Sequence, residues 1–191
     1  MTASATRENI VTAADRLFYE KGFAHTAFSD IAAAVQISRG NFYYHFRTKD
    51  EILAAVIARR LANTAAMLAA WDAEETDPAA RIRRFIGILL MNRVKILRHG
   101  CPVGTLCQEL AKLDHVAQAN AAALFALFRD WLARQFTALG REAGAEALAL
   151  HLLARSQGAA TLANAFHDEA FLHAEVARME AWLDEETPPC S

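Results

Sequence analysis

Proline, glycine and cysteine are scarce in this sequence of 191 residues, with four, eight and three occurrences respectively. Few prolines and glycines mean few obligatory breaks in helices. Alanine, the residue with the highest helix propensity, is abundant instead, whereas strands prefer β-branched and aromatic residues. The composition therefore favours helices over sheets.

The sequence also has no uninterrupted apolar run of about 18 residues, and its N-terminus has no apolar core. The first absence argues against a membrane-spanning helix and the second against a secretory signal peptide. Three cysteines in a chain without a targeting signal are expected to stay reduced. We therefore expect a cytoplasmic protein with no membrane partner.

The motifs of common enzyme classes are missing as well. Four candidate ligands lie near one another in sequence, but their spacings match no familiar zinc site: His99, Cys101, Cys107 and His115. No glycine-rich phosphate loop and no nucleophile elbow occurs. We therefore expect no metal, no cofactor and no enzymatic activity. The alternative is a helical enzyme or small-ligand carrier that uses Cys101 or a buried histidine, because catalytic partners can meet only in the fold.

Three short helices are predicted at the N-terminal end of the chain. Apolar residues recur at helical spacing over residues 6–22, and Gly22 supplies a stop. Thr26 can cap a second helix, and Ser38 can cap a third that runs from Arg39 to about Phe46. Short helices with tight turns, the last of them aromatic and basic, predict a helix-turn-helix DNA-binding domain over residues 1–50.

The third helix carries the side chains that can read DNA. From Ile31 to Lys49 there is no acidic residue. Arginine can bond a guanine edge twice and asparagine an adenine edge twice, whereas tyrosine and lysine suit phosphate oxygens. A solvated polar face is the alternative interpretation of these side chains. The predicted DNA-binding residues are Thr26, Ser38, Arg39, Gly40, Asn41, Tyr43, Tyr44, His45 and Lys49.

At these residues the chain resembles the TetR family of repressors, from Ile10 to Leu53. The resemblance rests on stretches that occur in the family's order: residues 13–18, 21–23, 26–32 and 38–53. It implies a dimeric repressor that binds a palindromic operator in double-stranded DNA and is released by a small-molecule or electrophile inducer. Gln36 departs from the family pattern, which usually has glycine in this turn, and we expect a mildly strained left-handed backbone there.

Residues 51–187 predict a second helical domain, for effector sensing and dimerisation. A capping box at Thr48–Glu51 begins a long helix that ends near Trp71. Asp77-Pro78 opens a helix that runs to Gly100. Four more helices are expected over about 101–113, 116–139, 145–167 and 170–186. The fold class is therefore all-α.

The last two helices, residues 145–186, are the predicted homodimer interface, as the resemblance implies. One apolar stripe suits such an interface: Leu172, Val176, Met179 and Leu183, backed by Phe171 and Trp182. Small residues in the preceding helix would permit close approach: Ser156, Gly158, Ala159, Ala160 and Ala163. The alternative is that both helices bury these residues inside one subunit.

Two kinds of trigger are compatible with the sequence. The run Gly100–Leu110 resembles a Gly-Cys turn in a subset of TetR-type regulators, some of which respond to electrophiles or oxidants. Cys101 sits at a helix N-cap, where a thiolate is stabilised, and Cys107 is the second candidate thiol; both can also be plain packing residues. A non-covalent effector can instead lodge among Met67, Trp71, Phe85, Leu89, Arg93, Phe125, Phe128 and Trp131, although such stripes are more often core.

Overall fold

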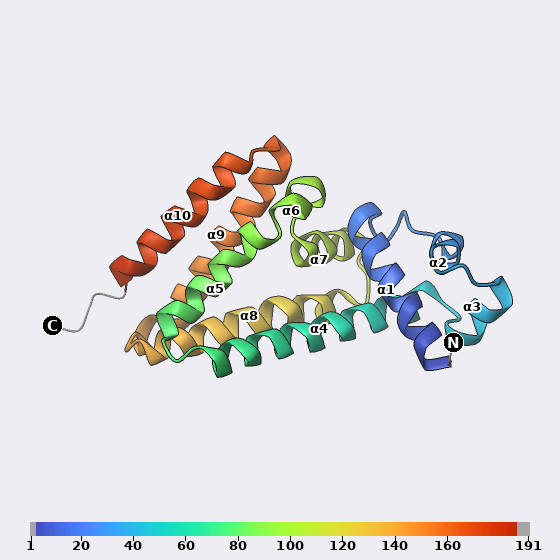
Figure 1. Ribbon diagram of the computed structural model, residues 1–191, viewed down its shortest axis with the longest axis horizontal. Helices are drawn as coiled ribbons and strands as arrows, with labels where there is room; N and C mark the ends of the chain where they lie inside the picture. The colour runs from blue at the N-terminus through green and yellow to red at the C-terminus, as the bar shows by residue number, and fades with distance from the viewer. Residues whose placement is uncertain (1–2, 187–191) are drawn as a thin grey trace. The chain divides into compact units, whose positions relative to one another are not determined.

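The computed structural model describes residues 3–186, and within this range the chain forms ten α helices, one 3-10 turn and no strand (Figure 1). The all-α prediction is confirmed. In chain order the elements are α1 (Ala3–Lys21), α2 (Phe28–Val35), α3 (Arg39–His45), α4 (Lys49–Glu74), α5 (Pro78–Met91), α6 (Arg93–His99), α7 (Pro102–Lys112), α8 (Gln118–Ala138), the 3-10 turn (Glu142–Gly144), α9 (Ala145–Phe166) and α10 (Glu169–Glu186).

The described chain packs as two compact units. The first, which we call the head unit, contains residues up to 63 together with 105–123, and the second, the body unit, contains 64–104 together with the residues from 124 onward. The chain passes from one unit to the other within α4, between Gly104 and Thr105 of α7, and within α8. The predicted boundary at residue 50 lies at the start of α4, whereas the head unit also includes half of α4 and most of α7.

The core of the head unit contains the side chains that the sequence predicted. Ile31, Phe42 and Phe46 are buried together with Leu17 and Phe18 of α1. The same core also contains three residues from α7 and α8 that periodicity had not linked to it: Leu106, Leu110 and Ala121. Segments that are distant in sequence therefore complete the hydrophobic support of the three short helices.

Local capping rules explain where the helices of the head begin. The hydroxyl of Ser38 accepts a hydrogen bond from the amide of Asn41, as predicted for the N-cap of α3. Thr48 accepts from the amide of Glu51, but the Glu51 carboxylate accepts from the amide of Arg47 at 2.8 Å, and not from that of Thr48. Gln36 adopts φ 54°, so the predicted left-handed backbone is confirmed.

The helix predicted from Pro78 to Gly100 is two helices, and this prediction was wrong. Asp77 caps α5 as expected, accepting from the amides of Ala79 and Ala80. The chain leaves regular helical geometry at Asn92, where φ is −104° and ψ is 9°. The Asn92 side chain donates to the carbonyl oxygen of Ile88, and this local bond competes with continuation of the helix.

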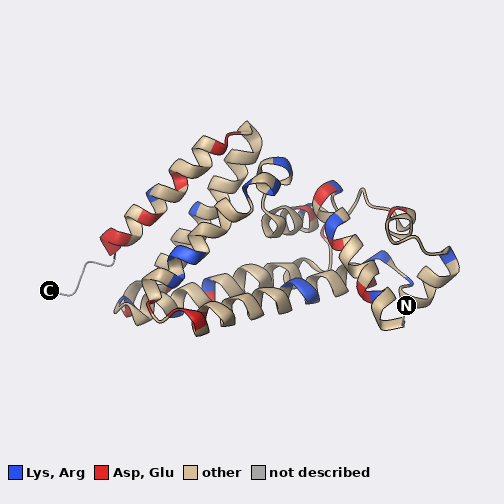
Figure 2. Ribbon diagram, in the orientation of Figure 1, with Lys and Arg blue, Asp and Glu red and all other residues tan. Residues whose placement is uncertain are grey.

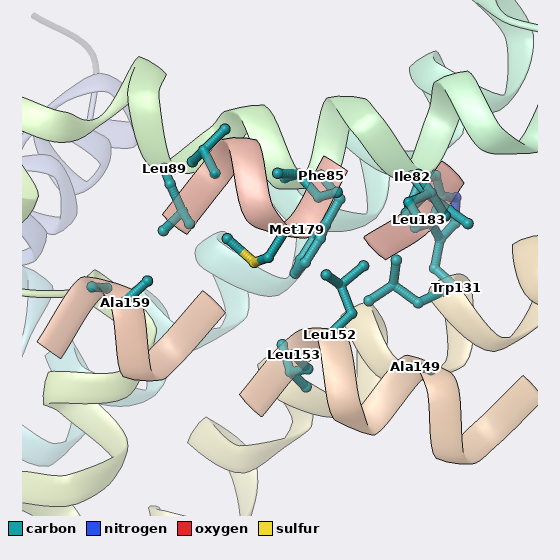
Figure 3. Close-up of a cluster of buried hydrophobic side chains, with 14 of the residues drawn as sticks. Ile82, Phe85, Leu89, Trp131, Ala149, Leu152, Leu153, Ala159, Met179 and Leu183 are labelled. Carbon is teal, nitrogen blue, oxygen red and sulfur yellow. The ribbon is translucent and has the colours of Figure 1, made fainter. Parts of the chain in front are cut away.

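The body unit is built around one apolar cluster that joins α5, α8, α9 and α10. Figure 3 shows Phe85, Leu152 and Met179 pointing toward one another from three of these helices. The stripe predicted as the dimer interface lies in this cluster, with Leu172, Val176, Met179 and Leu183 at most 3% exposed. Four of the five small residues of α9 are buried with it, namely Ser156, Ala159, Ala160 and Ala163. Assigning these residues to a dimer interface was wrong, because they are core within one subunit.

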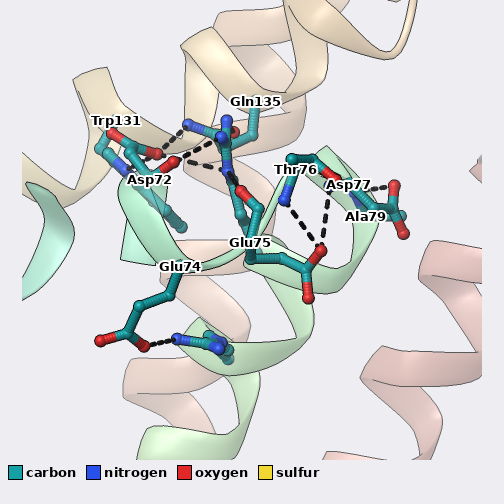
Figure 4. A network of polar contacts seen from close by, with 10 residues as sticks. Asp72, Glu74, Glu75, Thr76, Asp77, Ala79, Trp131 and Gln135 are labelled. Carbon is teal, nitrogen blue, oxygen red and sulfur yellow. Dashed lines mark hydrogen bonds and ion pairs between the residues drawn. The ribbon is translucent and has the colours of Figure 1, made fainter. Parts of the chain in front are cut away.

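Polar side chains that are buried or partly buried form a network around Asp72 at one end of this cluster (Figure 4). The indole of Trp131 donates to the Asp72 carboxylate at 3.0 Å, and the amide of Gln135 donates to the same oxygen at 3.3 Å. Arg81 donates to the Gln135 side chain and to the carbonyl oxygens of Asp72 and Glu75. The network thereby satisfies the polar groups that packing of α4, α5 and α8 removes from water.

Among the described residues, α4 is the one helix long and apolar enough to cross a membrane by length and composition. Its apolar residues have other partners. Ile52, Leu53 and Val56 belong to the core of the head unit, and Leu68 and Trp71 belong to that of the body unit. Packing in two protein cores accounts for the apolar composition of this helix.

Replacing Met179 with alanine should lower the free energy of unfolding by about 2–5 kcal/mol, because it leaves a cavity in a fully buried site. The measurement is urea denaturation followed by circular dichroism. Ala69→Ser, at an exposed position of α4 in the same unit, is the control and should change stability little. Comparable stability of Met179→Ala and the control would show that Met179 is not core.

Candidate nucleic-acid interface and sensor cluster

Helix α3 turns one side to the core of the head and the other to solvent. Phe42 is 1% exposed, whereas Tyr43 is 44% and Tyr44 78% exposed. Arg39, Gly40 and Asn41 are exposed as well, and His45 is half-buried. The predicted base-reading side chains therefore share the solvent side of one short helix.

The exposed side of α3 is positively charged and rigidly mounted. The helix contains Arg39 and no acidic residue, and this contrasts with α10, whose acidic residues are red in Figure 2. Tyr43 stacks on Phe28 of α2 with ring centroids 5.7 Å apart, and Phe28 also meets Phe42 edge-on at 5.2 Å. These aromatic contacts fix α3 against α2, so that its polar face is presented in one orientation.

Thr26 does not have the roles predicted for it. Its side chain is 1% exposed, and its hydroxyl donates to the carbonyl oxygen of Gly22 at 2.7 Å. The N-cap of α2 is Ala27, whose amide donates to the carboxylate of Asp30. A buried threonine in this position ties α2 to the end of α1, and it cannot offer its hydroxyl to DNA.

Ser38 and Lys49 also have internal partners. The oxygen of Ser38 is engaged in capping α3. The Lys49 ammonium donates to the carbonyl oxygen of Phe23 at 2.9 Å and lies 4.3 Å from the centre of the Phe23 ring. Sequence reasoning assigned Lys49 to phosphate, and the structure gives it a bond to the turn between α1 and α2.

That turn has a further partner, which the sequence did not reveal. The Glu109 carboxylate of α7 accepts hydrogen bonds from the amides of Phe23 and Ala24, each at 2.8 Å. These residues are 86 and 85 positions apart from Glu109 in the chain, so no local pattern could link them. Glu109 lies in the Gly100–Leu110 run, where the cysteines had marked the segment as notable but the glutamate had not.

Most of the predicted effector residues meet in the core cluster of the body unit. Trp71, Phe85, Leu89 and Trp131 are buried in it, and Met67, Phe125, Phe128 and Cys101 are partly buried against it. Trp71 and Trp131 lie edge-to-face at 5.7 Å, and Phe85 and Phe128 lie 5.5 Å apart. The structure therefore brings these side chains together.

Two predicted sensor residues lie elsewhere. Arg93 is exposed and donates to the carboxylate of Glu169 at 2.8 Å, so placing it with the apolar effector residues was wrong. The helix ends at Asn92, so Arg93 starts a new helix and does not continue the buried stripe of α5. Cys107 packs against the core of the head unit rather than with Cys101.

Cys101 precedes the first turn of α7, as predicted from Pro102. Its sulfur accepts from the amide of Gly104 at 3.5 Å, which is the arrangement of a helix cap. Within the described part of the chain, no disulfide joins Cys101 to Cys107. The third cysteine, Cys190, lies outside the described residues.

Family models match both parts of this chain. Residues 10–56 match the model described as bacterial regulatory proteins, tetR family, and residues 78–178 match the C-terminal domain of LmrA/YxaF-like transcriptional regulators. An uncharacterised helix-turn-helix regulator of Lactococcus lactis is 30% identical over 136 residues, covering 70% of this chain and 69% of that protein.

Two further relatives extend over most of the chain. The transcriptional repressor DhaR of Mycobacterium sp. strain GP1 is 22% identical over 169 residues, covering 83% of this chain and 82% of its own. A TetR transcriptional regulator from Legionella pneumophila superposes with a TM-score of 0.80 at 25% identity, over 94% of this chain and 96% of that one.

Proposed function

Because the chain belongs to the TetR family and is a DNA-binding transcriptional regulator, not an enzyme, we propose that it is a cytoplasmic, dimeric repressor that reads a palindromic operator with α3. The observation that carries the proposal is the solvent-exposed face of α3, which contains no acidic residue and lies on a helix anchored in the core of the head unit. Residues 1–50 supply the contacts to DNA, and residues 51–187 supply dimerisation and the response to an inducer. Repression agrees with the relative DhaR, which is a transcriptional repressor.

Each side chain of α3 has a distinct role in this proposal. Arg39 and Asn41 read base edges in the major groove, because their fork-shaped groups bond two base atoms at once. Tyr44 and His45 lie beside them, with ring centroids 5.1 Å apart, and contact bases or the DNA backbone. Tyr43 and the backbone at Ser38 and Gly40 suit phosphate oxygens. Lys49 contributes to the head's stability first, through its bond to Phe23.

Arg39→Ala should weaken operator binding by roughly 1–3 kcal/mol and relax preference at one base pair, because one bidentate base contact is lost. Fluorescence anisotropy with a set of single-base operator variants measures both effects. The matched control is Arg129→Ala, which removes the same charge from α8 of the body unit. If Arg39→Ala and the control bind every operator variant as wild type does, α3 is not the reading helix.

The dimer interface is better placed on the outward faces of α9 and α10. The exposed side of α10 includes four alanines, beside the charged residues Arg178, Asp184 and Glu185: Ala170, Ala174, Ala177 and Ala181. The exposed side of α9 is similar and includes larger apolar residues, since Leu150 is 48%, Leu162 43% and Phe166 71% exposed. A second copy of this chain fits these faces, because small residues let helices approach closely and the burial of apolar area stabilises the pair. Family membership supports the same helices.

Ala177→Glu should convert the dimer to a monomer while the subunit stays folded, because it places an unpaired carboxylate in the proposed interface. Sedimentation velocity measures the mass, and circular dichroism measures the helix content. Ala70→Glu makes the same change on an exposed position of α4 and should leave a dimer. A dimeric Ala177→Glu protein would place the interface elsewhere.

The proposed trigger is a small apolar molecule bound among the partly buried rings of the body unit. Met67, Phe125 and Phe128 offer apolar surface that the core has not fully covered. The indole N–H of Trp131 is already bonded to Asp72, so this tryptophan contributes ring surface rather than a donor. A covalent adduct at Cys101 is the second candidate, favoured by its cap position at α7.

One reagent separates these triggers. Wild-type protein and the Cys101→Ser variant, each bound to fluorescent operator, are treated with N-ethylmaleimide. If the trigger is non-covalent, the reagent should release the same amount of DNA from both, because both contain Cys107. Anisotropy records the release of DNA, and mass spectrometry confirms the adducts. Release from the wild type alone would assign the trigger to the Cys101 thiol.

A further inference from the structure

We propose that Glu109 is a positioning residue for the DNA-reading helix: it holds the turn between α1 and α2 and thereby sets the orientation of α3. This inference rests on the proposed function, since it concerns how the head is kept ready for DNA. It assigns a role to a side chain of α7, a helix in which sequence analysis had singled out only the cysteines.

Glu109 makes two hydrogen bonds that need two acceptor oxygens at the reach of a glutamate side chain. One carboxylate oxygen accepts from the amide of Phe23 and the other from the amide of Ala24, both at 2.8 Å. Bonds from amides to an ionised carboxylate are shorter and stronger than neutral ones. The approach is close, because a Cβ atom on Gly22 would lie 3.0 Å from the Glu109 carboxylate, and Gly22 also has φ +91°. Gly22 thus satisfies both the backbone geometry and the space that the carboxylate needs.

The carbonyl oxygens of the same turn bind a positively charged group, the Lys49 ammonium. Lys49 donates to the carbonyl oxygens of Phe23 and Ala24, at 2.9 and 3.4 Å. The Phe23 ring is buried between Phe18, the Lys49 ammonium and the edge of His115. Opposite charges from α7 and α4 therefore bind the donors and the acceptors of one two-residue segment.

A continuous series of contacts leads from this turn to α3. The carbonyl oxygen of Gly22 accepts from the buried hydroxyl of Thr26, and α2 begins directly after Thr26 and Ala27. In α2, Phe28 packs against Phe42 and Tyr43 of α3. A shift of the turn consequently moves the base of α2, and with it the helix that presents Arg39.

Helix α7 begins in the body unit. Its first turn, up to Gly104, belongs to that unit, and a Cβ on Gly104 would lie 2.6 Å from the side-chain oxygen of Gln157 in α9. Five residues separate Gly104 from Glu109, a rise of about 7.5 Å along one rigid helix. The turn that Glu109 holds and the first turn of α7 are thus linked through one continuous helix.

The test compares Glu109→Gln with Asp114→Asn, which removes an exposed carboxylate in the same unit at a residue with φ 47° that asparagine tolerates. Glutamine keeps one acceptor but turns a donor toward the second amide. The first readout is hydrogen exchange of the Phe23 and Ala24 amides by NMR in the full-length protein. The second is the affinity for a duplex selected from a random library by wild-type protein, and for a scrambled duplex, at a temperature where every variant is folded.

Glu109→Gln should accelerate exchange of both amides about tenfold and weaken binding to the selected duplex by about tenfold, while scrambled DNA binds no more weakly. Weaker binding to the selected duplex distinguishes this proposal from a simple charge effect, because the loss of a negative charge alone would strengthen DNA binding. Asp114→Asn should not slow or speed these amides and should bind at least as tightly as wild type. A merely destabilising change would leave the ratio of selected to scrambled affinity unaltered.

Unchanged exchange of both amides in Glu109→Gln, or selected-duplex affinity equal to or above that of the wild type, would overturn the proposal. If Glu109→Gln does not fold, Glu109→Asp decides, since its charge is kept but its reach is one methylene shorter, and both effects should then be present in weaker form. If wild-type protein selects no duplex, the proposed function fails, and the amide exchange still reports whether Glu109 holds the turn.

Discussion

The amides of Phe23 and Ala24 follow the end of α1, at the place where the chain turns toward α2 and α3. Their hydrogen bonds to Glu109, together with those from Lys49 to the adjoining carbonyls, fix this turn with charged groups from α7 and α4. Backbone groups removed from water need such partners, and here they come from outside the three-helix motif. The position of α2 and α3 therefore depends on interactions that the motif does not itself contain.

The two compact units give this dependence a functional meaning. The head unit contains Leu106 and Leu110 of α7 in its core, whereas the first turn of α7 packs in the body unit. The same helix thus contributes residues to both units. A regulator needs such a link, because a ligand can shift DNA affinity only through differential contacts in the two states.

Local rules allowed much of the head to be predicted from sequence. Ser38 and Asp77 cap helices because their short side chains reach nearby amides, and Gln36 adopts the left-handed geometry that the turn demands. These interactions span a few residues, so spacing reveals them. The exposed face of α3 followed from burying Phe42 and Phe46 on its other side.

Interactions between distant segments could not be predicted in the same way. Thr26 had two possible uses for its hydroxyl, and the fold selected the carbonyl oxygen of Gly22. The stripe of α10 that includes Val176 suited either a partner subunit or the subunit's own core, and periodicity cannot distinguish them. Arg93 was misplaced because the break at Asn92 has no proline or glycine to mark it.

The most direct test of the whole interpretation is a fluorescence anisotropy titration of wild-type protein against the DNA beside its own gene and against a scrambled duplex, over a range of salt concentrations. A dimeric repressor should saturate at an even number of protomers per site and prefer the operator over the scrambled duplex by at least about 10³-fold. Its log affinity should also fall linearly with log salt concentration. Equal affinity for the two duplexes would contradict this interpretation.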